Sequence, residues 1–67
     1  MMLINNVLPI RLTFIMPDKT RREGNFPPSL RLCDVMRELK IEESVPYDTN
    51  LNLGMLNLRN GDEIQVS

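Results

Sequence analysis

The sequence contains no histidine and only one cysteine, Cys33. Without an imidazole, the chain has no histidine base to activate a nucleophile and lacks a usual ligand of zinc. A single cysteine cannot form a disulfide within the chain, so a reducing, cytoplasmic setting is expected. These absences argue against an enzyme, and we expect no catalytic residue, no cofactor and no metal ion.

A strong charge bias and a long hydrophobic run are missing as well. The net charge of the 67 residues is -1, which predicts no nucleic-acid partner. The opening Met1–Ile10 is apolar but is interrupted by two asparagines and a proline, and it is too short to span a membrane. A chain of this length buries only ~60% of its unfolded surface and supports one small core. We therefore expect one domain over residues 1–67, with residues 1–6 as a loose lead-in.

Hydrophobic alternation predicts a first strand at Ile10–Met16, where every second residue is apolar. Pro17–Thr20 has the proline and the aspartate of a turn and predicts a hairpin. The second strand, Arg21–Phe26, is charged and contains Gly24. This composition is typical of a strand at the edge of a sheet.

One amphipathic helix is predicted at Ser29–Lys40, where apolar residues repeat at helical spacing at Leu32, Val35, Met36 and Leu39. Asp34 in the first turn and Lys40 in the last turn suit the helix dipole. We expect the apolar stripe to cover the sheet. Cys33, in the first turn, is either a reactive thiol or, more commonly, a small buried or half-buried side chain.

The segment that follows the helix predicts only short elements. A short strand is expected around Val45–Tyr47, and the apolar run Leu51–Leu58 is expected to form a packed turn. Asn60-Gly61-Asp62 predicts a tight turn with a positive φ at Gly61. Glu63–Val66 then alternates like a half-buried strand.

The stretches "PDKT", "PPSLRLCDVMREL" and "LGMLNLRNGDEIQV" supply a turn, a helix and a final strand in that order. Together they resemble the ubiquitin-like β-grasp family, whose small modifiers end in a similar Leu-x-x-Gly-Asp-x-Ile-x-Val pattern. The resemblance covers Ile10–Val66 and implies an α+β fold in which one helix covers a mixed sheet of about four strands, the third and fourth shortened. It also implies that the last strand runs beside the first. The residues brought under the helix are then Ile10, Leu12, Phe14, Ile64 and Val66.

The last residues distinguish the members of this family that are conjugated or carry sulfur from those that only bind a partner. Modifiers and sulfur carriers need a flexible Gly-Gly tail for adenylation, and Gln65-Val66-Ser67 offers none. The resemblance therefore implies a non-catalytic ubiquitin-like domain that binds a protein partner and is not itself conjugated. Two alternatives stay open: a modifier or sulfur carrier whose tail is missing from this sequence, and a small subunit that completes a partner's sheet by strand addition.

The candidate partner-binding residues come from the outer sheet face and the first hairpin. The outer face is expected to be polar, with an apolar spot only from Ile15, Val45 and Tyr47. Lys19, Arg21 and Arg22 form a basic cluster that suits an acidic partner or a phosphate, or that simply marks a charged edge strand. The full candidate set is Arg11, Thr13, Ile15, Lys19, Arg21, Arg22, Val45, Tyr47 and Gln65.

Shortened third and fourth strands would leave the sheet thinly covered beyond the final strand. Unpaired backbone groups at such an edge are a template for another strand. The sequence therefore predicts weak self-association or addition of a partner's strand at this edge.

Overall fold

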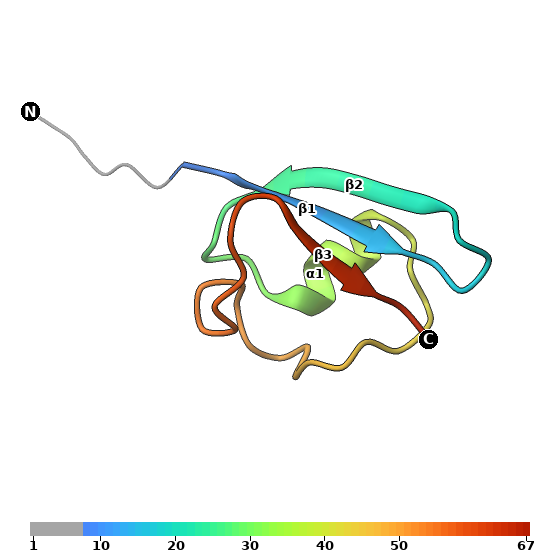
Figure 1. Cartoon of the computed structure of the whole chain (residues 1–67). Coiled ribbons are helices and arrows are strands. Elements are labelled where there is room, and N and C mark those ends of the chain that lie inside the picture. The colour runs from blue at the N-terminus through green and yellow to red at the C-terminus, as the bar shows by residue number, and fades with distance from the viewer. Residues whose placement is uncertain (1–7) are drawn as a thin grey trace, which may run out of the picture.

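A computed structural model describes residues 8–67, so the predicted lead-in at residues 1–6 lies outside the described residues. The chain forms β1 (Ile10–Ile15), β2 (Arg21–Phe26), α1 (Leu32–Glu38) and β3 (Asp62–Gln65) in that order. The strands make one mixed sheet in the order β2-β1-β3, and α1 lies against one face of it (Figure 1). The protein is thus a small α+β domain with one helix and three strands among the residues described.

The register of the sheet sorts its side chains into two faces. β1 pairs antiparallel with β2 and parallel with β3, with Leu12 opposite Asp62 and Phe14 opposite Ile64. Because strand side chains alternate, the even-numbered residues of β1 and β3 share the helix side. The predicted burial of Leu12, Phe14, Ile64 and Val66 is confirmed, while Ile10 is half-buried. The core consists of Leu12, Phe14, Met16, Phe26, Leu32, Val35, Met36, Ile41, Leu53, Leu58, Ile64 and Val66.

The helix is shorter than the predicted Ser29–Lys40. Its first amides are satisfied by backbone carbonyls of the following loop: Leu32 donates to Leu51 at 3.0 Å and Cys33 donates to Thr49 at 2.9 Å. The prediction that Lys40 lies in the last turn is wrong, since Lys40 has a φ of 58°. The Ile41 amide donates to the Met36 carbonyl at 2.8 Å, which ends the helix in a Schellman motif.

The expected strand at Val45–Tyr47 is absent from residues 8–67, so the sheet described has three strands where about four were predicted. Pro46 has no N–H to give to a sheet ladder. The backbone on either side is also used elsewhere, because the Thr49 carbonyl binds α1 and the Ser44 carbonyl accepts the Ser67 amide at 3.1 Å. This part of the chain is therefore an irregular loop.

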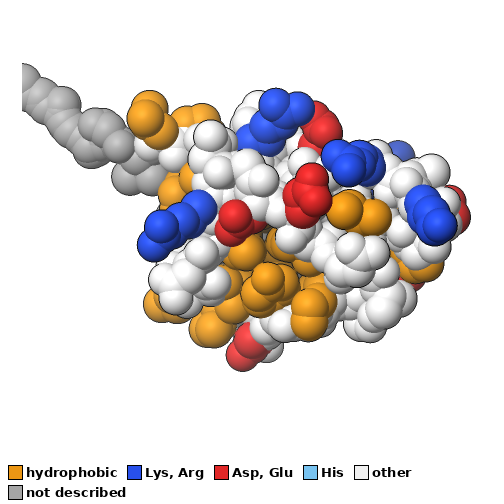
Figure 2. All heavy atoms as spheres, viewed as in Figure 1, with side chains coloured by type: hydrophobic (Ala, Val, Ile, Leu, Met, Phe, Trp, Pro, Cys, Tyr) orange, Lys and Arg blue, Asp and Glu red, His pale blue; other side chains and the backbone are white. Residues whose placement is uncertain are grey.

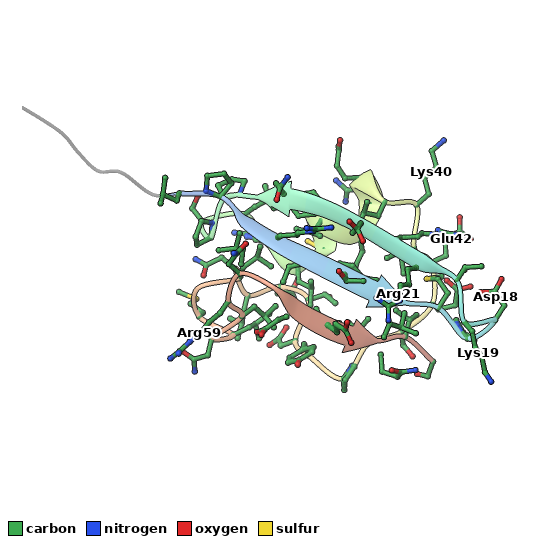
Figure 3. All side chains as sticks on the ribbon, turned by 45° about the horizontal axis from the view of Figure 1, so that its top comes forward. Asp18, Lys19, Arg21, Lys40, Glu42 and Arg59 are labelled. Carbon is green, nitrogen blue, oxygen red and sulfur yellow. The ribbon has the colours of Figure 1, made fainter. Side chains whose placement is uncertain are left out.

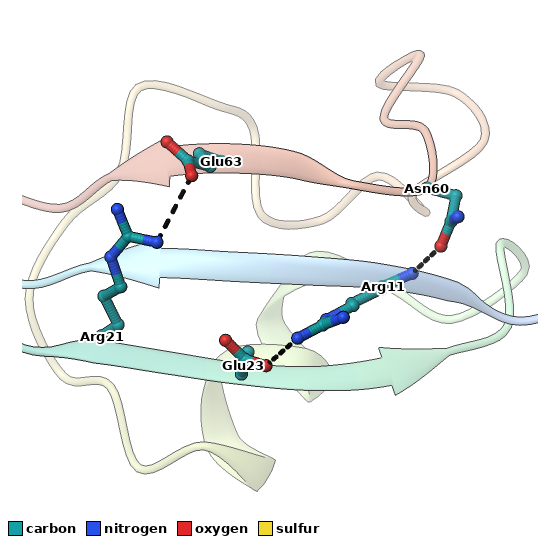
Figure 4. A network of polar contacts seen from close by, with 5 residues as sticks. All are labelled: Arg11, Arg21, Glu23, Asn60 and Glu63. Carbon is teal, nitrogen blue, oxygen red and sulfur yellow. Dashed lines mark hydrogen bonds and ion pairs between the residues drawn. The ribbon is translucent and has the colours of Figure 1, made fainter.

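The turn before β3 follows the prediction. Gly61 has a φ of 93°, and its amide donates to the Arg11 carbonyl at 2.8 Å. The Arg11 amide in turn donates to Oδ1 of Asn60 at 2.8 Å (Figure 4). The Asn60 side chain thus takes the place of a backbone carbonyl and ends the β1–β3 ladder.

Candidate protein-binding surface

The outer face of the sheet, which α1 leaves uncovered, carries most of the candidate residues. The register places Arg11, Thr13 and Ile15 of β1 on this face, between the odd-numbered residues of β2 and β3. Arg21 and Gln65 lie opposite Ile15 on the two flanking strands. The structure therefore brings five of the candidate residues together on one surface.

Two ion pairs hold long side chains across this outer face. Arg11 pairs with Glu23, and Arg21 reaches across β1 to Glu63 at 3.6 Å (Figure 4). Thr13 lies between these pairs and is 8% exposed. The four charged side chains are each at least two-fifths exposed, and exposed pairs contribute about 1 kcal/mol or less to stability. The two ion pairs therefore hold charged side chains in place on a polar surface and add little to stability.

The predicted basic cluster does not form a single surface. Arg22 lies on the helix side of β2 and donates from Nη1 to the carbonyls of Leu39 at 3.0 Å and Lys40 at 2.7 Å. Lys19 occupies the hairpin tip with a φ of 73°, and Figure 3 shows its side chain at the turn while Arg21 lies on the sheet. Arg22 therefore caps the carbonyls that follow α1. Lys19 lies at the hairpin tip and Arg21 on the outer face of the sheet.

The hairpin tip is closed by a small hydrogen-bonded turn. Oδ1 of Asp18 accepts from the Thr20 hydroxyl at 2.6 Å and from the Thr20 amide at 3.0 Å. These bonds, the hydroxyl first, hold the pKa of the Asp18 carboxyl below its ordinary value of 3.8. The Met16 carbonyl accepts the Lys19 amide at 2.8 Å and completes the turn.

Val45 and Tyr47 lie away from Ile15 and belong to a different surface. Both are half-buried and pack against the core from the loop that joins α1 to β3. The same loop carries Met55, which is 65% exposed, and Leu51, which is 36% exposed. We call the half-buried and exposed hydrophobic residues of this loop the loop patch: Val45, Tyr47, Leu51, Met55 and Leu56.

The loop that carries the loop patch joins α1 to β3 and ends at the start of β3. Figure 2 shows hydrophobic side chains gathered between β3 and the loop, with acidic side chains on both sides of them. The sequence shows Leu51–Leu58 only as a dense apolar run. Which of its members are buried depends on a turn at Leu53–Asn57, where Leu53 and Leu58 enter the core and Met55 is left outside.

A surface hollow of about 480 Å³ runs along α1 and past its end, lined by Cys33, Met36, Arg37, Lys40, Ile41, Glu42 and Thr49. Cys33 is half-buried in its wall. Arg37 is held by Asp34 at 3.3 Å. Across residues 8–67, no three His, Cys, Asp or Glu side chains lie close enough to share a metal ion.

Comparisons of the chain with protein-family models, with curated proteins and with solved structures found no match. Within residues 8–67, α1 is far too short to cross a membrane.

Proposed function

We propose that this chain is a non-catalytic, ubiquitin-like β-grasp domain that binds a protein partner with its folded surface in the cytoplasm and is not itself conjugated. The three-stranded mixed sheet with one helix on one face is compatible with a β-grasp. The parallel pairing of β1 with β3 agrees with the strand arrangement that the family resemblance implies.

The observation that carries this proposal is the loop patch beside β3. Met55 is 65% exposed, whereas Leu53 and Leu58 of the same turn region are almost completely buried. Contiguous exposed apolar surface bounded by charge is typical of protein-binding sites. The polar outer face next to it offers ordered hydrogen-bonding groups for the rim of such an interface.

The residues at the end of β3 support a function of the folded surface. Val66 is 3% exposed, and the Ser67 amide is bonded to the Ser44 carbonyl at 3.1 Å. Val66 and Ser67 are therefore fixed to the folded domain.

A site-specific crosslinking experiment tests this proposal. A photo-reactive residue at position 55 is expected to crosslink to a partner in an extract of the source cells, and excess unlabelled chain is expected to compete. The variant Met55→Glu should compete at least about ten-fold less well, because a carboxylate cannot be buried without a partner. The control position is Glu38, exposed on α1. Equal crosslinking from both positions, or equal competition by both chains, would contradict the proposal.

A second candidate function, a small subunit that completes a partner's sheet, is favoured by the open edge of β3. This strand has β1 on one side and no strand of residues 8–67 on the other.

A further inference from the structure

We propose that the outer edge of β3 binds an extended, basic segment of a partner protein as an added strand, with apolar residues at every second position of that segment. This inference rests on the proposed function and names the chemistry of the partner. Backbone direction, the loop patch and the distribution of charge each support one part of it.

The backbone of β3 offers free hydrogen-bonding groups on its outer side. The Val66 amide donates to the Ile15 carbonyl at 2.9 Å, so in a parallel ladder the amides of Ile64 and Val66 face β1. The amides and carbonyls of Glu63 and Gln65 therefore point away from the sheet. Within residues 8–67 they have no backbone partner.

The chain already makes one bond of this kind at the end of the same edge. The Ser67 amide, which continues the outward series after Gln65, donates to the Ser44 carbonyl at 3.1 Å. Between Ser44 and Asn60, however, the loop does not follow β3 as a strand. A strand supplied from outside finds the positions beside Glu63 and Gln65 open.

The loop patch requires alternation in the added strand. Side chains of an added strand point alternately to the helix side and to the outer face. Those on the helix side would face the hydrophobic side chains gathered between β3 and the loop (Figure 2), so they are apolar. Those on the outer face would lie beside Glu63 and Gln65, which are both exposed, so they are polar.

The charge of the added strand follows from the charge of this half of the chain. Residues 41–67 contain five acidic residues and one basic residue, a net charge of -4, whereas residues 8–40 contain seven basic and four acidic residues, a net charge of +3. Glu63 is exposed on β3, and its ion pair with Arg21 is long at 3.6 Å. Basic residues opposite Glu63 would complement it.

The other edge of the sheet is less suited to this role. The outward backbone of β2 belongs to Arg21, Glu23 and Asn25, and their exposed side chains place both signs of charge along the strand. Charged side chains discourage pairing at a sheet edge. Hydrophobic side chains also gather between β3 and the loop (Figure 2), where a strand at that edge would cover them.

A designed peptide provides the test. The probe is an acetylated and amidated peptide in which Lys and Val alternate, and its control has the same composition in two blocks, one of Lys and one of Val. At millimolar concentration, the alternating peptide should slow amide hydrogen exchange at Glu63 and Gln65, measured by NMR. The block peptide should not, because it cannot place Val over the loop patch and Lys on the outer face together.

Three variants of the chain sharpen the experiment. Gln65→Pro removes an outward amide and blocks the edge with a ring, while the bonds of β3 to β1 remain. It should weaken peptide binding at least about ten-fold, and Gln65→Ala, which keeps the amide, should leave binding within about two-fold. Glu63→Lys keeps the edge but should weaken binding several-fold at low salt.

The outcomes separate this inference from the proposed function. Protection at Arg21, Glu23 and Asn25 in place of Glu63 and Gln65, or equal binding by both peptides, would overturn the inference. Protection of Glu63 and Gln65 that grows with the concentration of the chain alone would identify a second copy as the occupant and would also overturn it. If crosslinking from position 55 persists in the Gln65→Pro variant, the proposed function stands and the added strand does not.

Discussion

At the scale of single residues, Arg21 and Arg22 differ because strand alternation turns them to opposite faces of β2. Arg21 points to the outer face, where it is more than half exposed and pairs with Glu63 at 3.6 Å. Arg22 points to the helix side and ties β2 to the carbonyls of Leu39 and Lys40 at the end of α1. An arginine therefore places an exposed charge on the sheet surface at position 21 and stabilises the fold at position 22.

Replacement of each arginine by alanine should show this difference. Arg22→Ala should lower the free energy of unfolding by about 1–3 kcal/mol, because two carbonyls lose a charged donor. Arg21→Ala should lower it by about 1 kcal/mol or less, since exposed ion pairs contribute little. Urea unfolding followed by circular dichroism measures both. Equal losses for the two variants would mean that the Arg22 contacts do not stabilise the domain.

Gly61 is the position where a side chain should be costly without any clash. Its φ is 93°, and a Cβ built there would meet no atom within 4 Å. Gly61→Val should therefore destabilise the domain by about 1–2 kcal/mol through backbone strain alone. Gly54→Ala is the matched control, because its Cβ would meet its nearest neighbour at 3.5 Å, an ordinary contact. Urea unfolding should show a much smaller change for the control.

The hairpin tip should respond to acid through Asp18. Its pKa is lowered in the folded state, chiefly by the Thr20 hydroxyl, so its contribution to stability is complete above the ordinary value of 3.8 and is lost as the pH falls through the lower, folded value. NMR titration of the carboxyl carbon should show this low pKa, and Thr20→Ala should raise it. An unchanged titration curve in the variant would assign the effect to another group.

At the scale of elements, α1 holds the domain together with few residues. Leu32 and Val35 are fully buried, and Met36 is 8% exposed. Leu39 lies just beyond the helix and is only half-buried. The contact between the helix and the sheet therefore depends most on Leu32 and Val35.

Truncation of Leu32 should test the helix contact. Leu32→Ala should cost about 2–5 kcal/mol, as is usual for large-to-small changes in a core. Leu51→Ala, in a residue that is 36% exposed, should cost clearly less. Thermal or urea unfolding of both variants provides the comparison. A melting curve of Leu32→Ala that matches the unchanged protein would contradict the packing of α1 on the sheet.

The sequence predicts those elements in which one local pattern dominates. Alternation in β1, the charged composition of β2 and the Asn60-Gly61 turn all act over a few residues, and the structure agrees with each. The start of α1 is mispredicted because it depends on carbonyls of Thr49 and Leu51, more than ten residues away. Local periodicity contains no information about such partners.

The candidate surface was predicted only in part for the same reason. The outer-face residues Arg11, Thr13 and Ile15 follow from alternation in one strand. The different places of Arg22 and Tyr47 depend on contacts with α1 and the core. Among residues 8–67, the expected open edge beyond the final strand does appear beside β3, whereas the loop patch depends on which residues of an irregular loop turn inward.

At the scale of the whole molecule, one small core sets the stability. All of the fully buried hydrophobic residues belong to a single cluster shared by the sheet, α1 and the loop. A domain of this size rarely gains more than about 3–5 kcal/mol from its core. We therefore expect one cooperative unfolding transition, with a free energy of unfolding within that range. Coincident transitions by circular dichroism and NMR would confirm it. Separate transitions for β2 and for the loop would show that the core does not act as a unit.

The parallel pairing of β1 with β3 also decides how the domain responds to mechanical force. The chain enters β1 at Ile10 and leaves β3 at Gln65, at opposite ends of the two strands (Figure 1). A pull between these points runs along both strands and strains all the hydrogen bonds between them at once. A pull from Ile10 to Phe26 would instead open the β1–β2 hairpin one bond at a time. Held at both ends, the domain therefore resists extension through the short ladder that starts at Leu12 and Asp62.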